Sequence, residues 1–76
     1  MQSVNISLNS IDKVKTFVNI IASFDGDFDL ASDRYVVDAK SIMGIFSLDL
    51  SKPLRLDIHD DGAAAALTEK LKDFIV

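Results

Sequence analysis

Residues 40–50, KSIMGIFSLDL, form the stretch on which the interpretation of the whole chain depends. Ser41 precedes a short run of large apolar side chains that a glycine interrupts. Because serine is a common N-cap, Ser41 predicts the start of a helix, and only about two turns fit before the chain turns near Pro53. So short a helix cannot form a core by itself, and its role depends on the elements around it.

Four predicted elements precede this stretch. Residues 4–8, VNISL, alternate apolar and polar side chains, which predicts a half-buried strand. Asn9 or Ser10 is then expected to cap an amphipathic helix. The apolar stripe of this helix consists of Ile11, Val14, Phe17, Val18, Ile21 and Phe24. Residues 28–30 and 35–38 are predicted to be two strands of a hairpin, joined by a short turn.

A fourth strand and a third helix follow. Residues 54–58, LRLDI, alternate again, and Asp60 or Asp61 is expected to cap the last helix. The buried stripe of that helix consists of Ala64, Leu67, Leu71 and Phe74. Alternating strands bury one face only, so all the helices must cover that face. The predicted class is α+β: an open-faced β-sandwich in the order βαββαβα, a four-stranded antiparallel sheet with three helices on one face. We expect the last strand to lie between the first two.

Composition predicts a single domain over residues 1–76 and excludes several functions. The chain is 49% hydrophobic and contains no cysteine, so we expect a packed core without disulfides or thiolate metal sites. The net charge of −4 argues against nucleic acid. No apolar run reaches the roughly 18 residues of a membrane span, and the first residues, MQSVNIS, do not resemble a signal peptide. We therefore expect a cytoplasmic protein, and we expect no cofactor.

The element order, together with KSIMGIFSL, resembles the HPr family, the small phosphocarriers of the bacterial sugar phosphotransferase system. The likeness spans essentially the whole chain. Residues 40–44 and 47–48 look like the regulatory-serine segment of that family. The resemblance implies the open-faced fold and protein partners from the phosphotransferase system or from its regulation.

The phosphorylated histidine of that family has no counterpart here. The family motif is a histidine in the first turn of the first helix, followed two residues later by arginine and then by proline. Ile11, Lys13 and Val14 stand in these places, within one residue. A shift of the alignment brings in Ser10 or Asp12, and Asp12 would allow an acyl phosphate, although the helix dipole already explains an acidic first turn. We therefore predict no catalytic residue and no enzymatic activity.

His59, the only histidine, is predicted to lie in the wrong place to substitute. It follows the fourth strand, which we expect to run antiparallel to the first. Five strand residues then separate His59 from the start of the first helix by roughly 17 Å. The sequence HDD at 59–61 is interpreted as an exposed histidine beside a capping aspartate, and not as a metal site.

The short helix after Ser41 is predicted to have two sides. Ile45 and Leu48 are three residues apart and are expected to face the sheet. Ile42, Met43 and Phe46 fall on another side, which the family resemblance implies is an exposed apolar docking patch. Methionine and aromatic side chains suit such a surface.

Two polar residues carry further expectations. Lys13, in the place of the family's arginine, is expected to belong to the partner-binding surface. Ser41 is expected to cap its helix, and the resemblance implies that it is also a possible site of regulatory phosphorylation, beside free helix N–H groups.

The function predicted from the sequence is that of an HPr-like domain without histidine phosphocarrier activity, which binds and regulates proteins through the segment Ser41–Phe46. One alternative is a working phosphocarrier or a serine-phosphorylated regulator of sugar uptake. Another is a ferredoxin-like regulatory module that binds a small molecule, although glycine-rich ligand turns are absent. We expect a monomer, with self-association through the apolar patch as the alternative.

Overall fold

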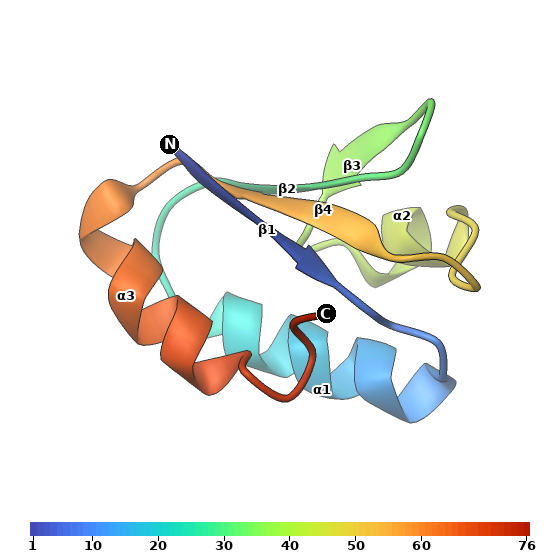
Figure 1. Ribbon diagram of the computed structural model, residues 1–76, viewed down its shortest axis with the longest axis horizontal. Helices are drawn as coiled ribbons and strands as arrows, with labels where there is room; N and C mark the ends of the chain where they lie inside the picture. Colours follow the sequence, from blue (N-terminus) through green and yellow to red (C-terminus); the bar gives the residue numbers. More distant parts are fainter.

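Four strands form one antiparallel sheet in the computed structural model, which describes residues 1–76 (Figure 1). The strands are β1 (Gln2–Ile6), β2 (Phe28–Ala31), β3 (Val36–Asp38) and β4 (Leu54–Ile58). Their order in the sheet is β1-β4-β2-β3, with every neighbouring pair antiparallel. The predicted insertion of the last strand between the first two is therefore confirmed.

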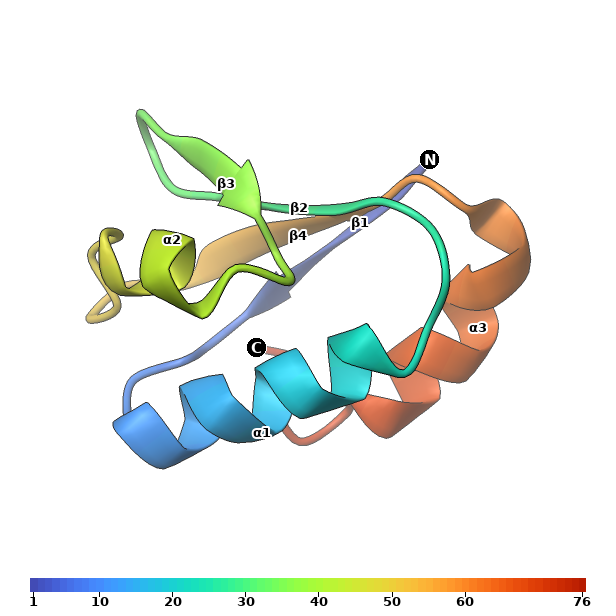
Figure 2. The same ribbon diagram turned by 180° about the vertical axis from the view of Figure 1, so that it is seen from behind.

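Three helices cover one face of this sheet, as predicted (Figures 1 and 2). They are α1 (Ile11–Ala22), α2 (Ile42–Phe46) and α3 (Asp61–Lys70). The predicted caps form: the side chains of Ser10, Ser41 and Asp60 each accept a hydrogen bond from a backbone N–H in the first turn. None of the three helices has the length and hydropathy needed to cross a bilayer.

The core lies between the helices and the sheet. Both layers contribute fully buried apolar side chains, namely Ile6, Leu8, Val14, Phe17, Ile21, Phe28, Leu30, Ile45, Leu54, Leu56, Ile58, Leu67 and Leu71. The rings of Phe17 and Phe74 meet edge to face, 6.4 Å between centroids. Because the chain has no cysteine, burial of this cluster is its main source of stability.

Element boundaries differ from the prediction at both ends of the chain. The first strand spans Gln2–Ile6, two residues earlier than predicted, and the last helix stops at Lys70. Gln2 and Ser3 belong to the first strand because they pair with Ile58 and Asp57 of β4. After α3 the residues turn back along the end of β1. Ile75 forms an antiparallel bridge with Ile6, and the N–H of Val76 donates to the carbonyl of Asn5. The C-terminal residues therefore cover the outer edge of β1.

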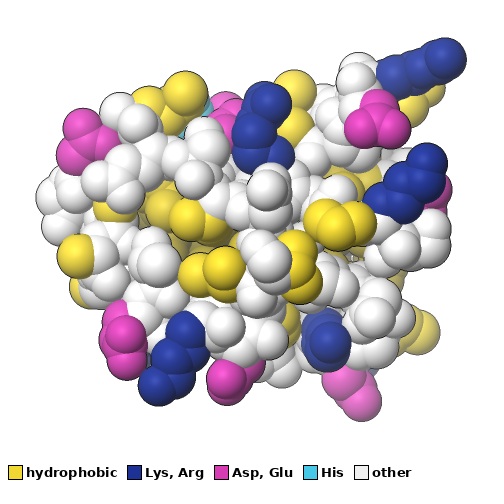
Figure 3. Space-filling model, in the orientation of Figure 1, with side chains coloured by type: hydrophobic (Ala, Val, Ile, Leu, Met, Phe, Trp, Pro, Cys, Tyr) yellow, Lys and Arg dark blue, Asp and Glu magenta, His cyan; other side chains and the backbone are white.

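Hydrophobic side chains reach the surface across the middle of the face shown in Figure 3, between β1 and the two long helices, and charged side chains lie mostly around the rim. Such exposure is common in small domains, whose surface is large relative to their core.

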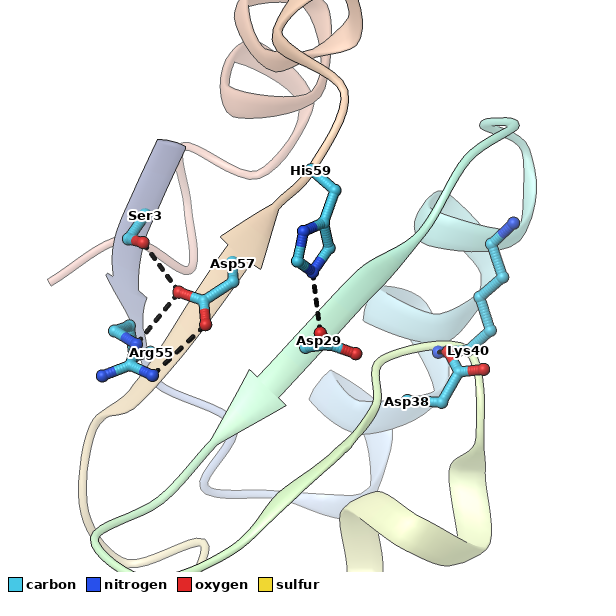
Figure 4. A network of polar contacts seen from close by, with 7 residues as sticks. All are labelled: Ser3, Asp29, Asp38, Lys40, Arg55, Asp57 and His59. Atoms are coloured by element: carbon cyan, nitrogen blue, oxygen red, sulfur yellow. Dashed lines mark hydrogen bonds and ion pairs between the residues drawn. The ribbon is translucent and has the colours of Figure 1, made fainter. Parts of the chain in front are cut away.

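The outer face of the sheet carries a row of three carboxylates, Asp57, Asp29 and Asp38, on adjacent strands and in direct register (Figure 4). Like charges directly opposite one another are unfavourable, and two of the three have a basic partner. The guanidinium of Arg55 contacts Asp57, with 2.9 Å from Nε to Oδ1, and Nε2 of His59 lies 2.7 Å from Oδ2 of Asp29. Asp38 has no ion pair within the chain.

Asp57 is the one buried charged residue. Burial by itself raises the pKa of its carboxyl group, but the hydrogen bonds from Ser3 and Arg55, together with the positive charge of Arg55, outweigh burial and lower that pKa below 3.8. The ionised carboxylate of Asp57 thus joins β1 to β4.

This lowered pKa predicts a loss of stability in acid. A carboxyl group with a folded pKa below its unfolded value contributes stability above the unfolded value of 3.8, and the contribution disappears as pH falls through the folded pKa. Asp57→Asn should therefore destabilise the protein near neutral pH and lose most of that effect in strong acid. Urea unfolding of both proteins at several pH values measures the difference, with Asp33→Asn as a control at an aspartate without hydrogen-bond partners. A difference that is the same at every pH would contradict this account.

Candidate functional site

The start of α1 and the end of α2 lie at the same end of the molecule (Figures 1 and 2). Between them is an open hollow of about 540 Å³ lined by Asn9, Ser10, Ile11, Phe46, Leu50 and Ser51. We call these six residues the α1–α2 surface. Ile11, Phe46 and Leu50 supply its apolar part, and serine and asparagine side chains surround it. The hollow is therefore shaped for an apolar side chain and holds no charged group.

The two predicted sides of α2 are present, with one difference. Ile45 and Leu48 are buried against the core, as predicted, whereas Met43 and Phe46 are 77% and 41% exposed. Ile42, which was predicted to be exposed with them, is half-buried and packs against the core. Ile42 is the first residue of a helix of little more than one turn, and this position keeps its side chain next to the core.

Ile11 lies on the surface, although the sequence placed it in the buried stripe of the first helix. Its side chain is 62% exposed, while Val14, Phe17 and Ile21 of the same stripe are buried. Ile11 is the first residue of α1, directly after the N-cap, and lies at the edge of the core. The hydrophobic periodicity of the first helix extends to Ile11, but the buried core does not extend that far along the helix.

The backbone of the first turn of α1 helps to align the family motif. The N–H of Val14 donates to the carbonyl of Ser10 at 3.1 Å, so it belongs to the helical ladder. The N–H of Lys13 bonds only the side chain of Ser10. A proline has no N–H and fits the first turn, so the family's proline matches position 13 better than position 14. The family's histidine then corresponds to Ser10 and its arginine to Asp12. Position 10 holds a serine and position 11 an isoleucine.

His59 lies at the opposite end of the sheet from this surface. Gln2, at the start of β1, pairs with Ile58, while Ile6, which leads toward α1, pairs with Leu54. The ring of His59 contacts Asp29, and Asp60 caps α3, so the residues of the HDD sequence point to different partners. No three potential metal ligands come together anywhere in the chain.

The α1–α2 surface offers apolar side chains and neutral polar groups. Ser10 offers the only hydroxyl at the start of α1, and it already accepts the hydrogen bond from Lys13. Nearby, hydrogen bonds from the hydroxyl and the N–H of Ser51 lower the pKa of the exposed Asp49, which stays ionised. No basic side chain lines the hollow to activate a hydroxyl.

Comparison with known proteins shows the family. The family model described as PTS HPr component phosphorylation site matches residues 13–76, and the chain therefore belongs to the HPr phosphocarrier family of the phosphotransferase system. The match begins at Lys13, after Ser10 and Ile11. No curated protein matches the chain.

Two solved structures are similar over nearly their full length. HPr-C-His from Thermoanaerobacter tengcongensis is 27% identical, with a TM-score of 0.74 over 96% of this chain and 92% of that one. The phosphocarrier protein HPr from Bacillus anthracis str. Ames is 25% identical, with a TM-score of 0.65 over 99% of this chain and 94% of that one. They confirm the fold and, together with the family match, remove the alternative of a ferredoxin-like module.

The exposure of Phe46 predicts a contrast between two neighbouring substitutions. Phe46→Asp should cost only about 1–2 kcal/mol, because the side chain is already partly in water. Ile45→Asp places a charge in the core and should cost more than about 4 kcal/mol, enough to unfold so small a domain. Thermal melting followed by circular dichroism measures both. If Phe46→Asp also unfolds the protein, the α1–α2 surface is part of the core.

Proposed function

We propose that this HPr-family protein has lost histidine phosphocarrier activity and acts as a protein-binding regulatory domain through the α1–α2 surface, with Ile42, Met43 and Lys13 beside it. The proposal rests on one observation: an apolar, exposed Ile11 at the start of α1, across a hollow from Phe46. We propose a cytoplasmic location and partners among the proteins of the phosphotransferase system or its regulators.

The physical case follows from the character of the hollow. Phosphoryl transfer needs a nucleophile at the start of α1 and groups that stabilise charge. Here the helix begins with Ile11, which lines the hollow together with Phe46 and Leu50. This apolar lining suits an apolar anchor on a partner better than a phosphate. Exposed apolar side chains grouped in this way favour association, which supports a binding role.

Phosphorylation by the phosphotransferase system tests the first part of the proposal. We expect no acid-labile phosphate on the protein after incubation with phosphoenolpyruvate and enzyme I. Ser10→His should gain the label and Ile11→His should gain less, because the proline argument aligns position 10 with the histidine. Both variants are made with His59→Ala, which removes the other imidazole. Label on Asp12 or Ser10 of the unsubstituted chain, or on His59, would contradict the loss of activity.

Binding tests the second part. Phe46→Asp should weaken capture of the partner by about 30-fold or more, the effect of removing an interface hot spot. Val76→Asp is the control, since Val76 is also an exposed apolar residue, at 67%, and lies outside both the hollow and the β3 edge. Purified enzyme I and extracts of the native bacterium serve as sources of partners. Equal loss for both variants, or no loss for Phe46→Asp, would argue against this surface.

Ser41 supports a second candidate function, regulation by phosphorylation. Its side chain is exposed, and its hydroxyl accepts a hydrogen bond from the N–H of Gly44 at 3.1 Å. A phosphate here would sit beside the start of α2 and close to Phe46, and so would add charge next to the apolar patch. Incubation with a kinase that phosphorylates the regulatory serine of HPr-family proteins, followed by mass spectrometry, tests this candidate.

A further inference from the structure

One edge of the sheet is covered in part, beside Asn5 and Ile6, and the other is bare. The C-terminal residues cover β1 through the bridge between Ile6 and Ile75. β3 forms the opposite edge, and the β2–β3 hairpin projects beyond the body of the molecule (Figures 1 and 2). Tyr35 and Val36, at the start of this edge, are 63% and 62% exposed. An exposed edge with apolar side chains is a ready template for pairing with another strand.

The hydrogen bonds show which residues of β3 present their backbone outward. The N–H of Ser32 donates to the carbonyl of Tyr35, and the N–H of Ala39 donates to the carbonyl of Phe28. Bonded and non-bonded pairs alternate along an antiparallel ladder, so Val37 faces β2 while Val36 points its N–H and carbonyl away from the sheet. The carbonyl of the next outward residue, Asp38, already accepts a hydrogen bond from the N–H of Ser41. Val36 therefore offers both a donor and an acceptor at the free edge.

The sequence of this edge is self-complementary. Residues 34–38 read Arg-Tyr-Val-Val-Asp. If two copies pair antiparallel about Val36, Tyr35 of each lies opposite Val37 of the other. Arg34, in the hairpin turn just before this edge, then lies near Asp38 of the other copy. Like charges at these two positions would have blocked self-pairing; opposite charges favour it.

The row of carboxylates on the outer face supports the same partner. Asp57 and Asp29 have Arg55 and His59, whereas Asp38, at the free edge, has no cation within the chain. Arg34 also makes no ion pair within the chain. In the paired arrangement Arg34 of the second copy supplies the missing positive charge beside Asp38.

The geometry points to a two-fold dimer in which the β3 edges of two copies pair antiparallel, centred on Val36, and join the two sheets into one. Each Val36 donates its N–H to the carbonyl of the other, and two Arg34–Asp38 contacts flank the pair. Such an interface is isologous, so one set of contacts closes the assembly. The contact area is small, which makes this a weak, concentration-dependent dimer. This dimer replaces our expectation of a monomer, and it does not depend on the proposed binding function.

Charge reversal tests the pairing. Sedimentation velocity of the full chain, from about 10 μM to about 1 mM protein, should show a monomer–dimer equilibrium. Arg34→Asp and Asp38→Arg each place like charges in both flanking pairs, and each should weaken dimerisation about tenfold or more. An equimolar mixture of the two variants restores both opposite-charge pairs and should recover the dimer. Lys72→Asp changes the charge by the same amount on another part of the surface and should have no effect.

Three results would overturn the proposal: a wild-type protein that remains monomeric throughout this range, a dimer that survives either reversal, or a mixture that stays monomeric. Circular dichroism verifies that both variants fold, since Asp38→Arg removes an acceptor for the N–H of Lys40. If Asp38→Arg does not fold, the proposal is decided by comparing the dimerisation of Arg34→Asp with that of the wild-type protein. If the Phe46→Asp variant still dimerises, the dimer does not form through the α1–α2 surface.

Discussion

The insertion of β4 between β1 and β2 is the constraint on which the rest of the molecule depends. It makes every neighbouring pair antiparallel and leaves one apolar face, which the three helices cover. It also fixes the two ends of the sheet: one leads from Ile6 toward α1, and the other leads from Ile58 to His59 and α3. Because of this separation, the only imidazole cannot reach the start of α1, whatever the flexibility of its own side chain.

Much of the fold follows from the sequence because local patterns and the global arrangement agree. The alternating residues of β4 and the capping residues Ser10, Ser41 and Asp60 predict the elements that form. The register of the C-terminal residues against β1 does not follow in the same way. Phe74 continues the apolar stripe of α3 and is buried, yet it lies in the turn after that helix. Periodicity indicates that a residue is buried but does not indicate whether the backbone is still helical.

The candidate site is harder to predict, because exposure depends on where the core ends. Ile11 and Val14 have the same apolar character and the same helical spacing, yet only Val14 reaches the core. A signal was present in the sequence: the first residue after an N-cap often lies at the edge of a helix's buried stripe. Ile42 shows the opposite case, since the short α2 brings it toward the core. Hydrophobic spacing therefore identifies the apolar surface of α2 but not the wall that α1 adds to it.

The two surfaces that we assign to association adjoin where α2 packs against β3. α2 packs under β3, and a Cβ at Gly44 would lie 3.2 Å from the Cβ of Val37, tighter than ordinary contact allows. Gly44 therefore sets how closely α2 approaches the sheet edge. The same helix carries Phe46 into the hollow beside Ile11. A change that displaces α2 from β3 would move Phe46, which forms a wall of the hollow. It would also loosen β3, whose edge is free. Gly44 therefore supports both the α1–α2 surface and the β3 edge.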